Sequence, residues 1–322
     1  MFEAITDYIM NRPPALLWGL VGVLAALTLG AIAAAVLPKL RPGRDYANLQ
    51  LRMNSWWVMA ALLVGALLGG WPAMTALFAL VSFLALKEFL SLAPMPREDR
   101  MLVLAAYLII PINYGFVVAN IYMFYLVFVP VYVFMAGPFL MACIGRTQDY
   151  LPRASVFHFA VVTCVYNLGY VALLMRVPDW DAPQAGPAGL VFMLLLATEA
   201  NDVLQYITGK LFGRRKIMPK VSPNKTWEGF LGGWILTAAL IVLVGPKFTP
   251  LEGVGLWVTA VTLPLAGFAG DVTMSAVKRD LGVKDTSAFI PGHGGVLDRA
   301  DSLVFTAPLF FHLLAFYALQ TV

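Results

Sequence analysis

The sequence has little charge and almost no cysteine. Only 12% of its 322 residues are Asp, Glu, Lys or Arg, whereas 60% are hydrophobic. A typical soluble domain carries about 25% charged residues, so this chain has too little polar surface to cover a water-soluble globule. Its two cysteines, Cys143 and Cys164, form no CxxC pair. They are too few for a disulfide scaffold, and we interpret them as packing residues.

Long hydrophobic runs dominate instead, with no internal repeat, low-complexity tract or separate soluble domain. A transmembrane helix needs about 20 mostly apolar residues. Ten segments meet this requirement: 15–37, 54–70, 72–93, 101–117, 119–140, 155–175, 187–207, 228–247, 254–277 and 303–321. The least certain boundaries lie at Gly69-Gly70-Trp71-Pro72 and near Ala119-Asn120. The sequence therefore predicts an all-α fold, a polytopic integral membrane helix bundle of about ten transmembrane helices.

The positive charges alternate between the loops that these spans define. Loops 38–53, 94–100, 141–154, 208–227 and 278–302 together hold 18 Lys and Arg, and the opposite loops and termini hold three. By the positive-inside rule, the rich loops face the cytoplasm and both termini lie outside.

The seventh predicted span ends in a polar face. Glu199, Asp202 and Tyr206 are spaced by three and four residues, so a helix places them on one side. A buried cation or phosphate site would explain this face. The alternative is a helix end that emerges among lipid headgroups.

A second polar cluster precedes the eighth span. Ser222-Pro223 predicts a turn, and Thr226 can cap the following helix, with Glu228 in its first turn. Helix N-termini attract phosphate, and Lys225 lies beside this one. The alternative is a well-capped helix with snorkelling lysines.

The third cluster is the most informative. Asp271, Ser275 and Lys278 fall on one helical face, and Asp271 follows 17 residues of apolar span. Residues 278–302 add four basic and four acidic side chains, one histidine and several glycines. Carboxylates suit Mg²⁺, glycine backbones approach phosphate oxygens, and basic residues neutralise phosphate charge. This composition predicts a polyphosphate and divalent-metal site at the cytoplasmic membrane face, an ordinary charged loop being the alternative.

The third cluster also resembles the signature of phosphatidate cytidylyltransferases, or CDP-diacylglycerol synthases. From Ser275 to Asp301 it reads Ser-x-x-Lys-Arg, four residues, Lys-Asp, then Pro-Gly-His-Gly-Gly, two residues and Asp-Arg-x-Asp. Residues 209–213 and 222–229 resemble further family motifs, and 85–89 is a faint echo of another. Bulkier residues at 203–205 depart from the family pattern, which leaves the exact lipid acceptor open.

The resemblance implies a Mg²⁺-dependent membrane cytidylyltransferase that condenses CTP with phosphatidate, giving CDP-diacylglycerol and pyrophosphate. A transferase for another lipid phosphate and a non-enzymatic transporter remain as alternatives. We expect a bacterial cytoplasmic membrane, with the active site facing the cytoplasm and no nucleic-acid partner; homodimer formation stays open. The N-terminal membrane region is 1–154, and the C-terminal catalytic membrane region is 155–322, with cytoplasmic loops 208–227 and 278–302.

The resemblance also implies roles for individual residues. Asp271 and Asp298 would hold Mg²⁺, with a second cation left open. The candidate catalytic residues are these two with Lys278, Arg279 and His293. The candidate substrate-binding residues are Asp202, Tyr206, Ser222, Lys225, Thr226, Ser275, Lys284, Asp285, Gly294, Gly295, Arg299 and Asp301.

Overall fold

Long apolar helices make up most of the part of the chain that the structure describes. A computed structural model describes residues 13–40, 46–93, 95–145, 147–176 and 185–318. Within these residues the segments long and apolar enough to cross a membrane are α2 (Pro14–Leu40), α3 (Ala47–Leu68), α4 (Gly70–Leu92), α5 (Arg100–Ala119), α6 to α7 (Tyr122–Cys143), α8 to α9 (Tyr150–Leu174), α10 (Gly186–Phe212), α11 (Trp227–Phe248), α12 (Gly253–Asp280) and α13 to α14 (Leu297–Ala318). The predicted all-α membrane bundle is therefore confirmed.

Both uncertain span boundaries are true helix ends. Gly69 lies between α3 and α4, and Gly70, the first residue of α4, has a φ of 75°. Asn120 ends α5 with a φ of 56°, in the left-handed conformation that stops the helical hydrogen-bond ladder. Each break lets the chain reverse and start the next span.

Two of the spans contain a π-helical segment that the sequence did not predict. The first span is divided into α6 (Tyr122–Val127), η2 (Phe128–Val133) and α7 (Phe134–Cys143), and the second into α8 (Tyr150–Val161), η3 (Val162–Tyr166) and α9 (Asn167–Leu174). The Tyr125 hydroxyl donates to the Tyr166 carbonyl at 2.7 Å, and the Tyr166 hydroxyl donates to the Leu126 carbonyl at 3.1 Å. These bonds pair backbone oxygens that lipid could not satisfy.

A short hairpin precedes α11. Strands β1 (Lys216–Met218) and β2 (Ser222–Thr226) pair antiparallel, with Met218 opposite Ser222. The turn expected at Ser222-Pro223 is therefore wrong: the chain turns at 219–221, because pairing with β1 draws residue 222 into a strand. The predicted cap is confirmed, since the Thr226 hydroxyl accepts a 3.1 Å hydrogen bond from the Gly229 N–H.

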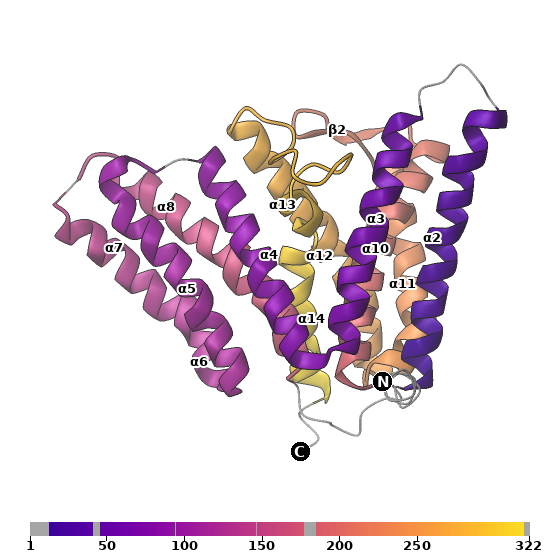
Figure 1. The fold of residues 1–322 in the computed structure, drawn as a ribbon, viewed down its shortest axis with the longest axis horizontal. Helices are drawn as coiled ribbons and strands as arrows, with labels where there is room; N and C mark the ends of the chain where they lie inside the picture. Colours follow the sequence, from indigo (N-terminus) through magenta and orange to yellow (C-terminus); the bar gives the residue numbers. More distant parts are fainter. Residues whose placement is uncertain (1–12, 41–45, 94, 146, 177–184, 319–322) are drawn as a thin grey trace, which may run out of the picture.

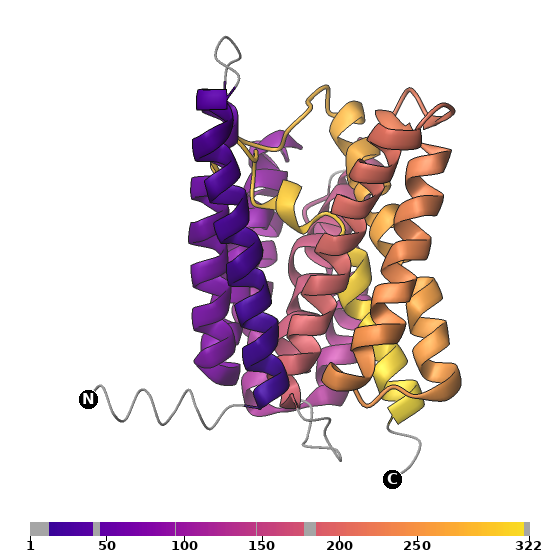
Figure 2. The ribbon, with the colours of Figure 1, turned by 90° about the vertical axis from the view of Figure 1, so that its right-hand side faces the viewer.

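The helices fall into two groups on either side of a central set. Figure 1 shows α2, α3, α10 and α11 at one side, α5 to α8 at the other, and α4, α12 and α14 between them. The hairpin, α13 and the loop before it lie at one end of the bundle, as do the α4–α5 and α7–α8 connections (Figures 1 and 2). The basic-rich connections after α4, α7, α10 and α12 therefore share one end, as the alternation of the positive charges predicts.

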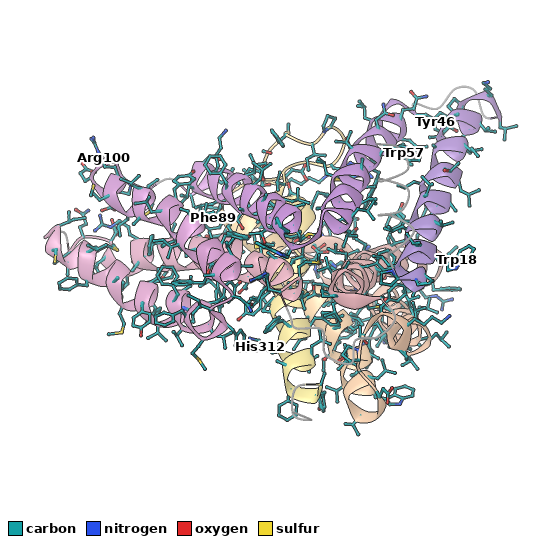
Figure 3. All side chains as sticks on the ribbon, turned by 60° about the horizontal axis from the view of Figure 1, so that its bottom comes forward. Trp18, Tyr46, Trp57, Phe89, Arg100 and His312 are labelled. Carbon is teal, nitrogen blue, oxygen red and sulfur yellow. The ribbon has the colours of Figure 1, made fainter. Side chains whose placement is uncertain are left out.

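Apolar side chains cover the outside of the bundle as well as its interior. Trp18 on α2 is 75% exposed and points away from the neighbouring helices (Figure 3). Tyr125, Tyr170 and Phe310 are fully buried. Such an outer surface suits hydrocarbon rather than water, which explains the low charge of the sequence.

Two further elements complete the description. A short 3₁₀ turn, η1 (Arg97–Asp99), precedes α5, and α13 (Leu297–Ala300) is a single turn before α14 (Leu303–Ala318).

The backbones of α10 and α11 lie close together near the hairpin: a Cβ at Gly229 would come 2.8 Å from the Gly209 Cα. Small residues permit this approach between membrane helices, and it brings the end of α10 beside β2.

Candidate active site

Asp271 lies near the end of α12, in contact with the hairpin. The Lys225 ammonium of β2 is 2.8 Å from one Asp271 oxygen, and the Ser275 hydroxyl donates to the other at 3.1 Å. A Cβ at Gly270 would come 2.5 Å from the Asp301 carbonyl, so α12 presses closely on the start of α14. The predicted face of Asp271 and Ser275 thus meets the predicted Lys225.

Two more carboxylates lie beside Asp271. The Ser302 hydroxyl donates to Asp202 Oδ2 at 3.0 Å, and the Ser302 N–H donates to Asp301 Oδ1 at 2.9 Å. The Asp202, Asp271 and Asp301 carboxylates are close enough to repel one another. Asp202 Oδ1 is buried and has no hydrogen-bond partner among the described residues. Asp202 comes from α10, Asp271 from α12 and Asp301 from the turn before α14, and the repulsion among the three carboxylates favours a bound cation.

Asp298 serves a different set of contacts. It is 4% exposed, and its Oδ1 lies 2.7 Å from the Lys278 ammonium. Its Oδ2 accepts hydrogen bonds from the Thr286 N–H at 2.7 Å, the Thr286 hydroxyl at 2.9 Å and the Gly295 N–H at 2.9 Å. Lys278 also lies 3.9 Å from Asp301, so it links Asp298 to the carboxylate cluster.

Glu88 of α4 anchors the same loop from the opposite side. Its Oε1 accepts from the Ser287 hydroxyl at 2.8 Å and the Val296 N–H at 3.0 Å. Its Oε2 accepts from the Leu297 N–H at 2.9 Å and lies 3.0 Å from the Thr286 hydroxyl, whose one proton is shared between this oxygen and Asp298 Oδ2. The motifs of the sequence predict no role for Glu88, although an acid inside a predicted span is itself a signal of function.

Helix α3 holds the Pro291–Gly295 segment. The Arg52 Nε donates to the Gly292 carbonyl at 3.0 Å, and the Ser55 hydroxyl donates to the Pro291 carbonyl at 2.8 Å. The Trp56 ring meets the His293 ring edge-on at 5.8 Å. Nothing local in the sequence pointed to these α3 residues, which lie about as far from the loop in the chain as Glu88 does.

The His293 imidazole is partly buried in this segment. Burial, helped by the nearby positive charges of Arg299 and Arg52, lowers the pKa of His293 from its usual 6.5. The ring is therefore neutral at pH 7, so it can donate or accept a hydrogen bond but adds no charge to the site.

The remaining candidates are less closely connected. Arg279 is exposed and donates to the Val283 carbonyl at 2.9 Å and the Val221 carbonyl at 3.3 Å, which joins α12 to the hairpin loop. Arg299 is exposed but interacts electrostatically with Glu199 and Asp301.

Four predicted contact residues lie at the margin. Tyr206 is 67% exposed, with the Lys210 ammonium 5.7 Å from its ring centre, so it does not share the burial of Asp202. Lys284 and Asp285 are exposed on the loop, and Ser222 is partly buried in β2. Their binding roles stay predictions.

Gly294 and Gly295 allow the loop to pack closely against the Asp298 and Glu88 carboxylates. Gly294 has a φ of 83°, and a Cβ there would lie 2.7 Å from Asp298 Oδ2. A Cβ at Gly295 would collide with the Thr286 hydroxyl and the Glu88 carboxylate. Because the Gly295 N–H already donates to Asp298, it is not available to a phosphate as the sequence suggested.

The acidic residues fit a magnesium ion held partly by substrate. Among the described residues, no three His, Cys, Asp or Glu side chains converge on one metal position. Mg²⁺ needs only one or two carboxylates when phosphates supply further ligands. The unpartnered Asp202 oxygen beside Asp271 suits such an ion. The Asp271 and Asp298 carboxylates are each paired with a lysine ammonium and a hydrogen-bond donor.

The sequence is similar to those of known proteins. The cytidylyltransferase family model matches residues 50–317. An uncharacterised Escherichia coli (strain K12) protein, YnbB, is 39% identical over 276 residues, which cover 85% of this chain and 90% of that protein.

Two proteins named phosphatidate cytidylyltransferase also match. The protein from Mycobacterium leprae (strain TN) is 38% identical over 53% of this chain and 50% of its own length. The protein from Staphylococcus epidermidis (strain ATCC 35984) is 34% identical over 54% of this chain and 67% of its own length. This chain therefore matches about half to two thirds of the length of these two relatives.

Proposed function

We propose that this chain, which belongs to the cytidylyltransferase family, transfers the cytidylyl group of CTP to the phosphate of phosphatidate. The products are CDP-diacylglycerol and pyrophosphate. The observation that carries this proposal is the meeting of Asp202, Asp271 and Asp301 with Lys225 and Lys278 at one end of a membrane bundle.

Charge neutralisation is the main task of such a site. A lipid phosphate and a nucleoside triphosphate are both anions. They must approach until an oxygen of the lipid phosphate attacks the α-phosphorus of the triphosphate. Lys225 and Lys278 flank the carboxylate cluster, and Arg299 lies at its rim. We assign these three to the phosphates, because ammonium and guanidinium groups form strong charge-assisted hydrogen bonds with them. Holding both reactants in line would supply much of the rate enhancement.

The reaction needs no strong base from the protein. The second pKa of a phosphate monoester is about 6, so its oxygens are largely ionised at pH 7. The attacking oxygen is therefore already a nucleophile, and the bond that breaks joins the α-phosphorus to the pyrophosphate oxygen. The chain has only to align the groups and balance their charge.

We assign the magnesium-binding role to Asp271 and Asp202, with Asp301 beside them. Mg²⁺ bound there would neutralise phosphate charge and stabilise the departing pyrophosphate. We also propose that Asp298 positions Lys278 and, together with Glu88, holds the loop through Thr286. Its sequence-based assignment to the metal stays a prediction. We further propose that this end of the bundle faces the cytoplasm, where CTP is supplied.

Turnover by the purified protein tests the proposal. The protein in lipid nanodiscs is given one nucleoside triphosphate at a time, with phosphatidate, an isoprenoid phosphate or no acceptor, and pyrophosphate release is measured. We expect release with CTP and phosphatidate together, dependent on Mg²⁺. A preference for another lipid phosphate would support the second candidate, which the bulkier 203–205 stretch motivates. No acceptor-dependent release from any pair would overturn both.

A further inference from the structure

An apolar groove lies between α11 and α12 on the outer surface of the bundle. Its volume is about 490 Å³, and its lining includes Trp234, Ala238, Ala239 and Leu243 of α11 and Trp257 and Val261 of α12. Ala239, Leu243, Trp257 and Val261 are all exposed. The two alanines keep the groove open, since a larger side chain at either position would fill it.

A row of aromatic rings connects this groove to the charged site. The Lys225 ammonium lies 4.7 Å from the centre of the Phe268 ring, and Phe268 lies 4.4 Å from Phe230. Phe230 stacks on Trp234 at 6.3 Å and 7°. The Trp234 indole N–H donates to the Val261 carbonyl at 2.8 Å. This bond fixes the indole ring at the end of the groove nearer to Phe230. The apolar surface is therefore continuous from the ion pair to the groove.

The spacing along both helices matches one lipid leaflet. At 1.5 Å per residue, Trp234 lies about 10 Å below the start of α11, and Val261 lies about 15 Å below Asp271. The groove then continues to Leu243, about 13 Å further along α11. Half of a bilayer's hydrocarbon core is about 15 Å thick, so the length of the groove is close to the thickness of one leaflet.

We propose that this groove holds one acyl chain of the lipid phosphate acceptor while its phosphate lies at Lys225. The inference rests on the proposed function and names where that function binds the lipid. The Lys225 ammonium beyond one end of the groove and the apolar walls of the groove complement a lipid with an anionic headgroup. The groove thereby selects and aligns the acceptor, because a lipid seated in it carries its phosphate to the carboxylate cluster.

Tryptophan fluorescence tests this site without any turnover. The protein is placed in nanodiscs containing either phosphatidate or phosphatidylcholine with brominated acyl chains at equal mole fraction, and no CTP is added. We expect brominated phosphatidate to quench more strongly, with the difference lost in the double variant Trp234→Phe, Trp257→Phe. The matched control Trp18→Phe, on the exposed face of α2, should keep the difference. Equal quenching by the two lipids would mean bulk lipid only, and no quenching of the two tryptophans would mean a covered interface; either overturns the proposal.

Kinetics give an independent test. Ala239→Phe should raise KM for long-chain phosphatidate about tenfold, while KM for a short-chain phosphatidate and for CTP stay unchanged. Ala136→Phe makes the same change on the exposed face of α7 and should have no effect. An unchanged long-chain KM in Ala239→Phe would contradict the inference. An inactive wild-type protein that still shows the phosphatidate-specific quenching would instead contradict the proposed reaction alone.

Discussion

Glu88 provides the sharpest test of how the loop is held. Its carboxylate accepts hydrogen bonds from the Ser287 hydroxyl and from the Val296 and Leu297 N–H groups, and it also contacts the Thr286 hydroxyl, which it shares with Asp298. Glu88→Gln preserves size but turns one acceptor oxygen into an NH₂ group. The hydroxyl facing that group can rotate and accept from it. The backbone N–H facing it cannot, so one buried donor loses its partner.

The free-energy cost of Glu88→Gln follows from this one backbone N–H that loses its acceptor. A buried hydrogen-bonding group left unpaired costs about 1–3 kcal/mol, which corresponds to about a 5- to 150-fold shift of the opening equilibrium of the loop. We therefore expect amide hydrogen exchange at Val296 and Leu297 to accelerate by about that factor in Glu88→Gln. Pyrophosphate release should fall in parallel, because the same loop positions Asp298 and Lys278.

The control is Glu252→Gln, an exposed acid at the start of α12, at the opposite end of that helix from Asp271. It should change neither exchange nor turnover. Unaltered exchange at Val296 and Leu297 in Glu88→Gln, in a protein with wild-type melting temperature, would refute the anchoring role of Glu88.

Three further changes probe the site. Asp271→Asn should lower Mg²⁺-dependent turnover by about 100-fold or more without altering the melting temperature, whereas the exposed Asp280→Asn should be silent in the same assay. Gly295→Ala should destabilise the folded protein by about 1–3 kcal/mol in thermal unfolding, because its methyl group has no room; an equally large loss in an α5 control, Gly115→Ala, where no neighbour lies within 4 Å, would count against this reason. The pKa of His293 is lowered in the fold, so the imidazole of the unfolded chain is protonated first as pH falls below about 6.5. The free energy of unfolding should therefore decline below that pH and level off below the folded-state pKa. His293→Gln should remove this part of the decline, and an identical pH profile in the variant would argue against the role of His293.

Much of the fold follows from local sequence. The spans follow from apolar length, and the breaks at Gly70 and Asn120 follow from residues that tolerate a positive φ. Thr226 caps α11 and Asp271 bonds Ser275 because both contacts join residues three or four apart. Contacts of this kind are encoded in spacing alone.

The missed features depend on contacts distant in the chain. Glu88 meets a loop about 200 residues away, and no periodicity indicates which loop its helix will approach. The same holds for Arg52, whose partner is the Gly292 carbonyl. The turn predicted at Ser222 is wrong because this residue pairs with Met218 across the hairpin, and that pairing makes it part of a strand. The contacts of Asp298 with Thr286, Gly295 and Lys278 are likewise not evident from its motif position.

The fate of the labelled phosphates of CTP tests the central claim most directly. CTP labelled at either the α- or the γ-phosphorus is incubated with phosphatidate, Mg²⁺ and the purified protein, and the lipid and aqueous phases are separated. Cytidylyl transfer predicts α-label in the lipid phase and γ-label in aqueous pyrophosphate. Label from the γ-phosphorus in the lipid, or no label in the lipid from either position, would contradict it.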